Sequence, residues 1–209
     1  MATPPRFKES GFNRRTFGCH RYDVYSPKMQ RQLILFGRHA LDLWTTLEAS
    51  PTVLSFCERP ITIPDRRPAR AVDFWVRRAE GEEFLILLRE TELPHPENSD
   101  AMGFTKIDGI PVRCIDPNEM SEHRITLINL GWIIRDLSAF GRFVPEPLCR
   151  ALANVLTQGK SIAQLQQELN DFDSSTVKLA VYTLLHRGEA VCRELTSKTL
   201  GLDLVIEAP

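Results

Sequence analysis

Asp73 is the residue of this chain best placed to do chemistry. It begins the segment Asp-Phe-Trp-Val, which a Glu80-Gly81 turn connects to an apolar segment that ends in Arg89 and Glu90. Aromatic and branched residues favour strands in both segments, so the pattern predicts a β-hairpin. Such a hairpin holds a carboxylate beside a second, charged strand end. Carboxylates in this setting bind the Mg²⁺ ions that activate water for phosphodiester hydrolysis, so the pattern indicates chemistry on DNA.

The register of this hairpin decides which residues join Asp73. If the turn has two residues, Asp73 lies opposite Leu88 and on the same face as Glu90. One bulged residue in the second strand would instead bring Leu87 and Arg89 beside Asp73. The sequence leaves both registers open.

Three carboxylates form a candidate metal site in the first register, namely those of Asp73, Glu90 and Asp42. Oxygen ligands of this kind suit Mg²⁺. The alternative is that Glu90 is solvated after its strand and that Asp42 lies on a helix surface. The five cysteines include no Cys-x-x-Cys pair, so neither a zinc site nor a disulfide framework is expected.

Basic charge is concentrated at the front of the chain. Residues 1–78 carry 14 Lys/Arg against 7 Asp/Glu, residues 79–145 carry 6 against 12, and residues 146–209 carry 6 against 8. Lys and Arg that neutralise phosphates supply most of the sequence-independent affinity for DNA. The N-terminal region is therefore a candidate DNA-binding arm, and a solvated basic tail is the alternative. The candidate phosphate contacts are Arg14, Arg15, Arg21, Lys28, Arg31 and Arg38.

The periodicity predicts an α+β domain in which helices flank a mixed β-sheet. Residues 1–27 show no period and are expected to be irregular. The expected elements after them are a helix, or a short strand leading into one, over 28–49, strands over 53–63, 71–76, 83–88 and 110–116, and a helix over 118–140.

A separate small module is expected from about residue 145. Leu148 to Leu156 has helical spacing, and Ser161 can cap a second helix that runs to Leu169. Ser174 or Ser175 can cap a third helix, with Gly188 as its terminating residue. Two short strands, over 190–195 and 202–207, would complete the order of a winged helix.

The third helix of this module would present Lys178 to a DNA groove, together with Ser175 and Tyr182. However, residues 146–209 carry a net charge of −2. Because DNA affinity depends on positive charge, this module is better suited to docking a protein than to reading DNA.

Several short motifs follow one another between Tyr22 and Phe140. They are Ser26-Pro27-Lys28, Pro51-Thr52-Val53, the run from Ser55 to Pro60, Asp73-Phe74-Trp75-Val76 and Asn129-Leu130. In this order they resemble TnsA, the endonuclease subunit of heteromeric cut-and-paste transposases. Members of that family share a basic lead-in, a helix, a Pro-x-Val, a strand that ends in Pro, an Asp-Phe hairpin and an Asn-Leu helix.

The resemblance implies three regions. These are a basic arm over 1–27, a restriction-endonuclease-like domain of the PD-(D/E)xK kind over 28–144, and a winged-helix-like domain over 145–209. It also implies a Mg²⁺-dependent phosphodiesterase that cuts at transposon ends. Its partners would be DNA, a DDE transposase and an AAA+ transposition regulator.

The catalytic positions of the family are incompletely matched. Asp73 matches the central metal ligand. The family's second-strand Glu or Gln falls at Leu87, its Lys at Arg89, and its helix Glu near Ala40, with Asp42 as the closest acid. Leucine cannot bind a metal, and a permanently protonated guanidinium does not freely replace a catalytic Lys.

Three hypotheses follow for the function. The first is a TnsA-like subunit that binds DNA and a transposase without cutting, with Asp73 and Arg89 as the remnant of a catalytic site. The second is an active Mg²⁺-dependent endonuclease, and the third is a winged-helix transcriptional regulator. No apolar run reaches the length of about 18 residues that a membrane span needs, and the N-terminus lacks a signal-peptide pattern. A cytoplasmic protein is expected.

Overall fold

The chain folds into two units. The computed structural model describes residues 4–12, 14, 18–64, 66–67, 69–89, 92, 105–156 and 158–209. Packing groups residues 1–47 with 52–122, and residues 48–51 with 123–209. The boundary expected near residue 145 thus lies inside the second unit. No helix of the described segments is long and apolar enough to cross a membrane.

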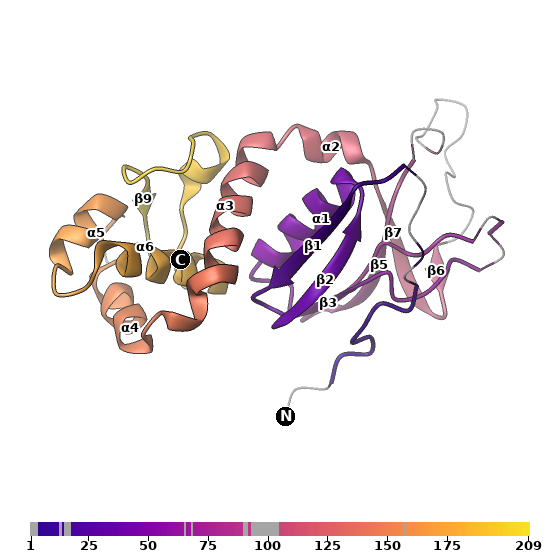
Figure 1. Ribbon diagram of the computed structural model, residues 1–209, viewed down its shortest axis with the longest axis horizontal. Coiled ribbons are helices and arrows are strands. Elements are labelled where there is room, and N and C mark those ends of the chain that lie inside the picture. The colour runs from indigo at the N-terminus through magenta and orange to yellow at the C-terminus, as the bar shows by residue number, and fades with distance from the viewer. Residues whose placement is uncertain are drawn as a thin grey trace. The chain divides into compact units, whose positions relative to one another are not determined.

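A β-hairpin opens the first unit. Strand β1 (Arg21–Ser26) pairs antiparallel with β2 (Arg31–Phe36), and the two run side by side in Figure 1. Leu33 and Leu35 are buried at alternate positions of β2, which is the period of a half-buried strand. The hairpin corrects the expectation that residues 1–27 are irregular throughout.

Helix α1 (Arg38–Ala49) follows the hairpin directly. Its buried residues Ala40, Leu43, Trp44 and Leu47 recur at intervals of three and four, so one stripe of the helix faces the interior. Of the two alternatives expected for residues 28–49, a strand leading into a helix is therefore the one observed.

The first unit contains a five-stranded mixed sheet in the order β3-β4-β5-β7-β6. Strands β3, β4 and β5 pair antiparallel in succession, whereas β7 joins β5 in parallel and β6 pairs antiparallel with β7. The mixed sheet agrees with the predicted α+β class. The bounds are β3 (Ser55–Glu58), β4 (Phe74–Arg78), β5 (Gly81–Leu87), β6 (Lys106–Ile107) and β7 (Ile110–Ile115).

The register of the β4–β5 hairpin differs from both expected registers. Arg78 pairs with Gly81, so the turn consists of Ala79 and Glu80, one residue earlier than expected. Gly81, at φ +150°, begins the second strand instead of closing the turn. Phe74 lies opposite Leu85, which places Asp73, one residue before β4, level with Ile86.

The helix expected over 118–140 is two helices. Helix α2 (Pro117–Ser121) is capped by the Asp116 carboxylate, which accepts from the Asn118 N–H, and it ends before His123. Helix α3 (Arg124–Phe140) starts the main body of the second unit. On this helix Ile128 and Trp132 are exposed, whereas Ile133, Ile134 and Leu137 are buried.

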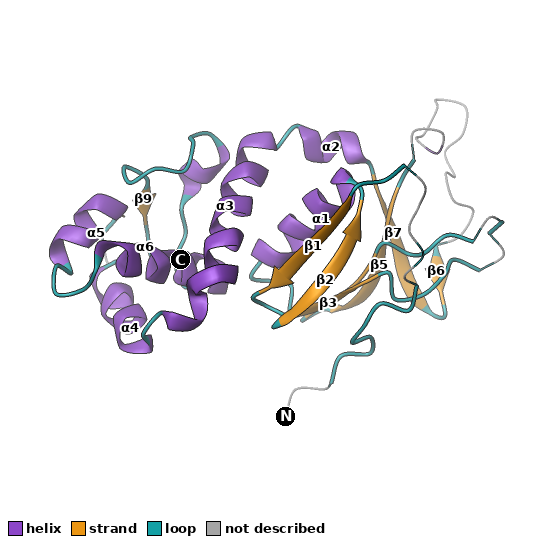
Figure 2. Cartoon of the chain, viewed as in Figure 1, coloured by secondary structure: helices purple, strands orange, loops and turns teal. Residues whose placement is uncertain are grey.

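Helices dominate the second unit, as Figure 2 shows. In α5 the Ser161 hydroxyl and the Gln164 side chain form a reciprocal capping box, so Ser161 is the predicted cap. Helix α6 is capped by Asp173 instead of Ser174 or Ser175, and Gly188 ends it at φ +73° as predicted. The elements after α3 are α4 (Glu146–Val155), β8 (Lys160–Ser161), α5 (Ile162–Glu168), α6 (Ser174–Arg187) and β9 (Val205–Ile206), with short 3₁₀ helices at Gly141–Phe143 and Arg193–Thr196.

The strand pairing predicted for a C-terminal hairpin between residues 190 and 207 is wrong. Strand β9 pairs with β8, and residues 193–196 form a 3₁₀ helix. Only a single antiparallel bridge, between Val191 and Glu207, joins the two segments within the described residues. The resulting order is helix, strand, two helices, a bridge and a strand.

The face of α6 that was expected to read DNA is partly covered. Tyr182 is only 3% exposed, and the Lys178 ammonium lies over its ring. Lys178 Nζ is also 3.5 Å from a carboxylate oxygen of Asp136 on α3. Tyr182 is therefore buried, whereas Lys178 is one third exposed and Ser175 is exposed, so a DNA-reading role for Lys178 stays a prediction.

Asn129 ties the C-terminal loop to α3. Its side chain is fully buried, and its amide donates to the carbonyls of Leu195 and Lys198 at 2.9 and 2.7 Å. Its Oδ1 accepts from the Leu200 N–H at 2.9 Å. A buried amide with three partners fixes the loop over residues 195–200, because each broken bond would leave a backbone group unsatisfied.

Asn129→Ala should therefore destabilise the second unit strongly. Alanine leaves two carbonyls and one N–H without their partner, and we expect the free energy of unfolding to fall by roughly 2–4 kcal/mol. Urea unfolding measures the change. Asn170→Ala, at an exposed turn, is the matched control and should cost little. Equal losses for the two variants would contradict the role of Asn129.

Candidate functional site

A pocket of about 560 Å³ opens around Asp73 in the first unit. The start of α1, the end of β3, the segment before β4 and the end of β5 form its walls. Its lining includes Gly37, His39, Ala40, Glu58, Arg59, Arg70, Asp73, Leu87, Leu88 and Arg89.

Asp73 is fixed between the two strands that flank β4. Its backbone N–H donates to the Leu85 carbonyl at 3.1 Å, and its carbonyl accepts from the Arg59 N–H at 2.9 Å. Its Oδ2 accepts from the Leu87 N–H at 2.8 Å. One oxygen of the carboxylate is therefore already used to hold the end of β5.

The environment of Asp73 disfavours its charge. Burial raises the pKa of this carboxyl from 3.8 to about 6, although the Leu87 N–H and the guanidinium groups of Arg70, Arg59 and Arg89 act in the opposite direction. Desolvation is therefore stronger than the attraction of three nearby cations. Around pH 6 the residue changes between its neutral and charged forms.

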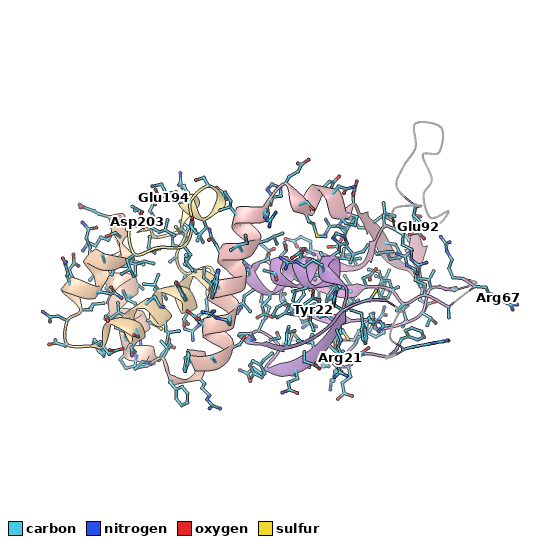
Figure 3. All side chains as sticks on the ribbon, turned by 45° about the horizontal axis from the view of Figure 1, so that its top comes forward. Arg21, Tyr22, Arg67, Glu92, Glu194 and Asp203 are labelled. Carbon is cyan, nitrogen blue, oxygen red and sulfur yellow. The ribbon has the colours of Figure 1, made fainter. Side chains whose placement is uncertain are left out.

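Two ion pairs neutralise other charges at the pocket. The Arg70 guanidinium binds the carboxylate of Glu92, which Figure 3 labels, and it also donates to the Leu87 carbonyl. Arg31 on β2 binds the Glu58 carboxylate through both terminal nitrogens, and Glu58 is only 3% exposed. Among the described charged residues that line the pocket, those left without such a pair are Asp73, Arg59 and Arg89.

Arg59 is the pocket residue that sequence reasoning missed. Its guanidinium carbon lies 4.9 Å from the ring centre of Phe12 and 4.8 Å from that of Phe36. Its Nη2 donates to the Arg14 carbonyl at 2.6 Å, whereas its Nη1 is buried without a hydrogen-bond partner. The signal that could have found it is its position across from Asp73, but that pairing is visible only once the β3–β4 register is known.

The four positions that the family resemblance marks as catalytic lie together. Ala40, Asp73, Leu87 and Arg89 all line the pocket. Ala40 and Leu87 are each 8% exposed, so they present apolar surface where the family has oxygen ligands. The arrangement therefore holds one carboxylate, Asp73, and one exposed cation, Arg89.

Of the other predicted metal ligands, Asp42 is not brought to Asp73. The Asp42 carboxylate accepts from Arg38 Nε at 2.9 Å and does not line the pocket. Glu90 lies outside the described residues. Within the described segments no three His, Cys, Asp or Glu side chains are grouped so that they could hold a metal ion. Asp73, bonded to Leu87 and facing guanidinium groups, does not fit a Mg²⁺ site.

Most of the basic residues predicted to bind DNA already have partners. Arg31 and Arg38 are ion-paired as described above, and Lys28 Nζ donates to the Leu47 carbonyl at 3.2 Å. Arg21 points outward from β1 in Figure 3, where it binds Asp23. Of the remaining two, Arg15 lies outside the described residues. Arg14, Arg15 and Arg21, the last paired with Asp23 two residues away, stay the candidates for contact with phosphates.

Asp73→Asn should stabilise the protein at about pH 8 and lose this advantage near pH 4. The raised pKa means that the folded chain binds more protons than the unfolded chain between 3.8 and about 6. Stability contributed by Asp73 therefore falls as pH rises through that window and stays low above it. Asparagine keeps an oxygen acceptor for the Leu87 N–H without the charge.

Urea unfolding of the Asp73→Asn variant and the natural protein at several pH values measures this difference. Asp171→Asn, at an exposed position, removes a charge of the same sign and should show no such trend. A gain in stability that does not depend on pH would contradict a buried charge at Asp73.

Comparison with protein-family models and curated sequences identifies no relative of this chain. No protein-family model matches the sequence, and no curated protein sequence is significantly similar to it. The functional argument therefore rests on the residues around Asp73 and on the fold that holds them.

Proposed function

We propose that this chain is a TnsA-like subunit of a DNA transposition machinery, which binds DNA and a transposase partner without hydrolysing the DNA itself. The observation that carries the proposal is the composition of the Asp73 pocket. A carboxylate stands at the start of β4, while Ala40, Leu87 and Arg89 occupy the positions where the family has its other catalytic groups.

The topology of the first unit supports this proposal. Helix α1 precedes three antiparallel strands, β3 to β5, and β7 then joins β5 in parallel. This order is compatible with a restriction-endonuclease-like domain, in which a carboxylate at the start of the second strand lies beside the end of the third. In the second unit, the order α4, β8, α5, α6, the Val191 bridge and β9 supports a winged-helix-like module.

The chemistry of the pocket argues against phosphodiester hydrolysis. A Mg²⁺ ion that activates water needs several oxygen ligands, and acidic side chains normally supply most of the compensating charge. Here Leu87 offers no ligand, and the cations of Arg59 and Arg89 would repel a metal ion. By the proposal, the pocket lies where the family has its nuclease site but lacks the oxygen ligands that would hold the metal ion.

An exposed apolar stripe on α3 supports a protein partner for the second unit. Ile125, Ile128 and Trp132 are 45%, 40% and 47% exposed and recur at intervals of three and four. Residues 123–209 carry 9 Lys/Arg against 9 Asp/Glu, so an apolar stripe on a unit without excess positive charge favours contact with a protein over contact with DNA. By the family resemblance, the DDE transposase and the AAA+ regulator are the proposed partners.

The protein alone should not nick DNA. With supercoiled plasmid and either Mg²⁺ or Mn²⁺, we expect no conversion to the open circular form, because one carboxylate holds a metal too weakly to activate water. Gel electrophoresis of the plasmid measures nicking. Cleavage that Asp73→Ala abolishes would establish the alternative, an active endonuclease, and would overturn the proposal.

Restoring the family's residues should restore metal binding only in combination. Ala40→Glu, Leu87→Glu and Arg89→Lys together supply two further carboxylates and the lysine around Asp73. We expect calorimetry to detect Mg²⁺ or Mn²⁺ binding by the triple variant and little binding by Leu87→Glu alone, because such a site acts as a unit. Equal binding by the single and triple variants would argue against the pocket as the remnant of a nuclease site.

Binding of DNA should depend steeply on salt and should involve the N-terminal arm. Each neutralised phosphate contributes a slope of about −0.9 to log affinity against log salt. Replacing Arg14, Arg15 and Arg21 with Ala should therefore flatten the slope measured by fluorescence anisotropy with duplex DNA.

A control triple variant removes the same charge from the second unit and should leave the slope unchanged. An unaltered slope in the arm variant would reject the arm, and undetectable DNA binding by the natural protein would reject the proposed function. The three exposed arginines changed in the control are Arg124, Arg142 and Arg150.

A further inference from the structure

The charge that faces the Asp73 pocket is positive once its internal ion pairs are counted. Glu58 is bound by Arg31, and Arg70 is bound by Glu92, so these four side chains neutralise one another in pairs. Among the described residues that line the pocket, Arg59 and Arg89 remain, against the single carboxylate of Asp73. The pocket is therefore suited to an anion and not to a metal cation.

Arg59 carries an unused hydrogen-bond donor. Its Nη1 is buried and has no partner, whereas its Nη2 is bound to the Arg14 carbonyl. The rings of Phe12 and Phe36 hold the guanidinium in place from within 5 Å. A charged donor without an acceptor costs free energy, and because Arg59 also lines the pocket, a small shift of its side chain would let an oxygen of a bound anion accept from the guanidinium.

The start of α1 adds backbone donors to the same pocket. Gly37, His39 and Ala40 line it, and the helix has 12 residues with no acidic side chain in its first turn. The first N–H groups of a helix have no acceptor within the helix and carry partial positive charge. The Gly37 N–H already donates to the His20 carbonyl at 2.8 Å, so the donors that remain for an anion are the N–H groups of the first residues of the helix itself.

We infer that the Asp73 pocket binds a phosphate group directly, through Arg59, Arg89 and the N-terminal N–H groups of α1, without a bridging metal ion. Donors on three separate elements suit a tetrahedral oxyanion with several acceptor oxygens, and guanidinium groups are well matched to phosphate. The volume of about 560 Å³ leaves room for an attached nucleoside. The inference rests on the proposed function, because it takes the phosphate to be that of a nucleic acid.

Inorganic phosphate tests the pocket without DNA. Calorimetric titration of the full chain in the presence of a chelator should show binding, and Arg59→Gln and Arg89→Gln should each weaken it about tenfold, the effect of losing one charge-assisted hydrogen bond. Asp73→Asn should tighten it, because it removes the negative charge beside the anion. Arg89 is exposed, so its variant tests the site even if Arg59→Gln disturbs the packing of the aromatic rings.

Arg67→Gln is the matched control, since Arg67 projects from its loop in Figure 3 and does not line the pocket. It removes the same charge and should leave the affinity unchanged. Equal weakening by Arg67→Gln, binding that requires Mg²⁺, or loss of binding in Asp73→Asn would each overturn the inference.

Two nucleotide probes separate the sources of the phosphate. A deoxydinucleotide with a 5′-phosphate should bind more tightly than inorganic phosphate. The same dinucleotide with a 5′-hydroxyl should bind more weakly than the phosphorylated form. Equal affinity for the phosphorylated dinucleotide and inorganic phosphate would assign the pocket to free phosphate and overturn its assignment to nucleic acid. No phosphate binding together with salt-dependent DNA binding would overturn this inference alone, whereas phosphate binding without DNA binding would overturn the proposed function.

Discussion

The hydrogen bonds of Asp73 hold the first unit together at its candidate site. Its backbone joins β4 to the Arg59 end of β3 and to Leu85 on β5, and its carboxylate holds the Leu87 N–H. The pocket walls formed by the ends of β3 and β5 are thus connected to this residue. The same bonds account for its chemistry, because a carboxylate occupied by a backbone donor and desolvated by its neighbours has less capacity to bind a cation.

Much of the first unit could be predicted from the residues of its strands. The aromatic and branched residues around Trp75 and Phe84 indicated a hairpin, and the hairpin is present. The turn was misplaced by one residue because a Glu-Gly pair is a strong turn signal, whereas Gly81 begins the strand. The break between α2 and α3 escaped prediction because neither Glu122 nor His123 is a residue that normally ends a helix.

The sequence predicted which residues lie at the site better than it predicted the bonds that they form. Asp73, Leu87 and Arg89, which only one of the two expected registers brings together, line one pocket. The Arg70–Glu92 pair joins residues 22 positions apart, and the Arg31–Glu58 pair joins residues 27 apart. Nothing in local periodicity reports such pairs, since they depend on how the strands meet. For the same reason, counting basic residues overestimated the surface charge available to DNA.

The Asn129 side chain has a consequence for the motions of the second unit. Its Oδ1 accepts the N–H of Leu200, a residue in a loop whose neighbours are largely exposed. Amide protons in exposed loops normally exchange with solvent through small local openings. Here exchange of the Leu200 amide requires release of a buried side chain of α3. We therefore expect deuterium exchange to report this loop and α3 as one cooperative element, although 71 positions separate the two residues along the chain.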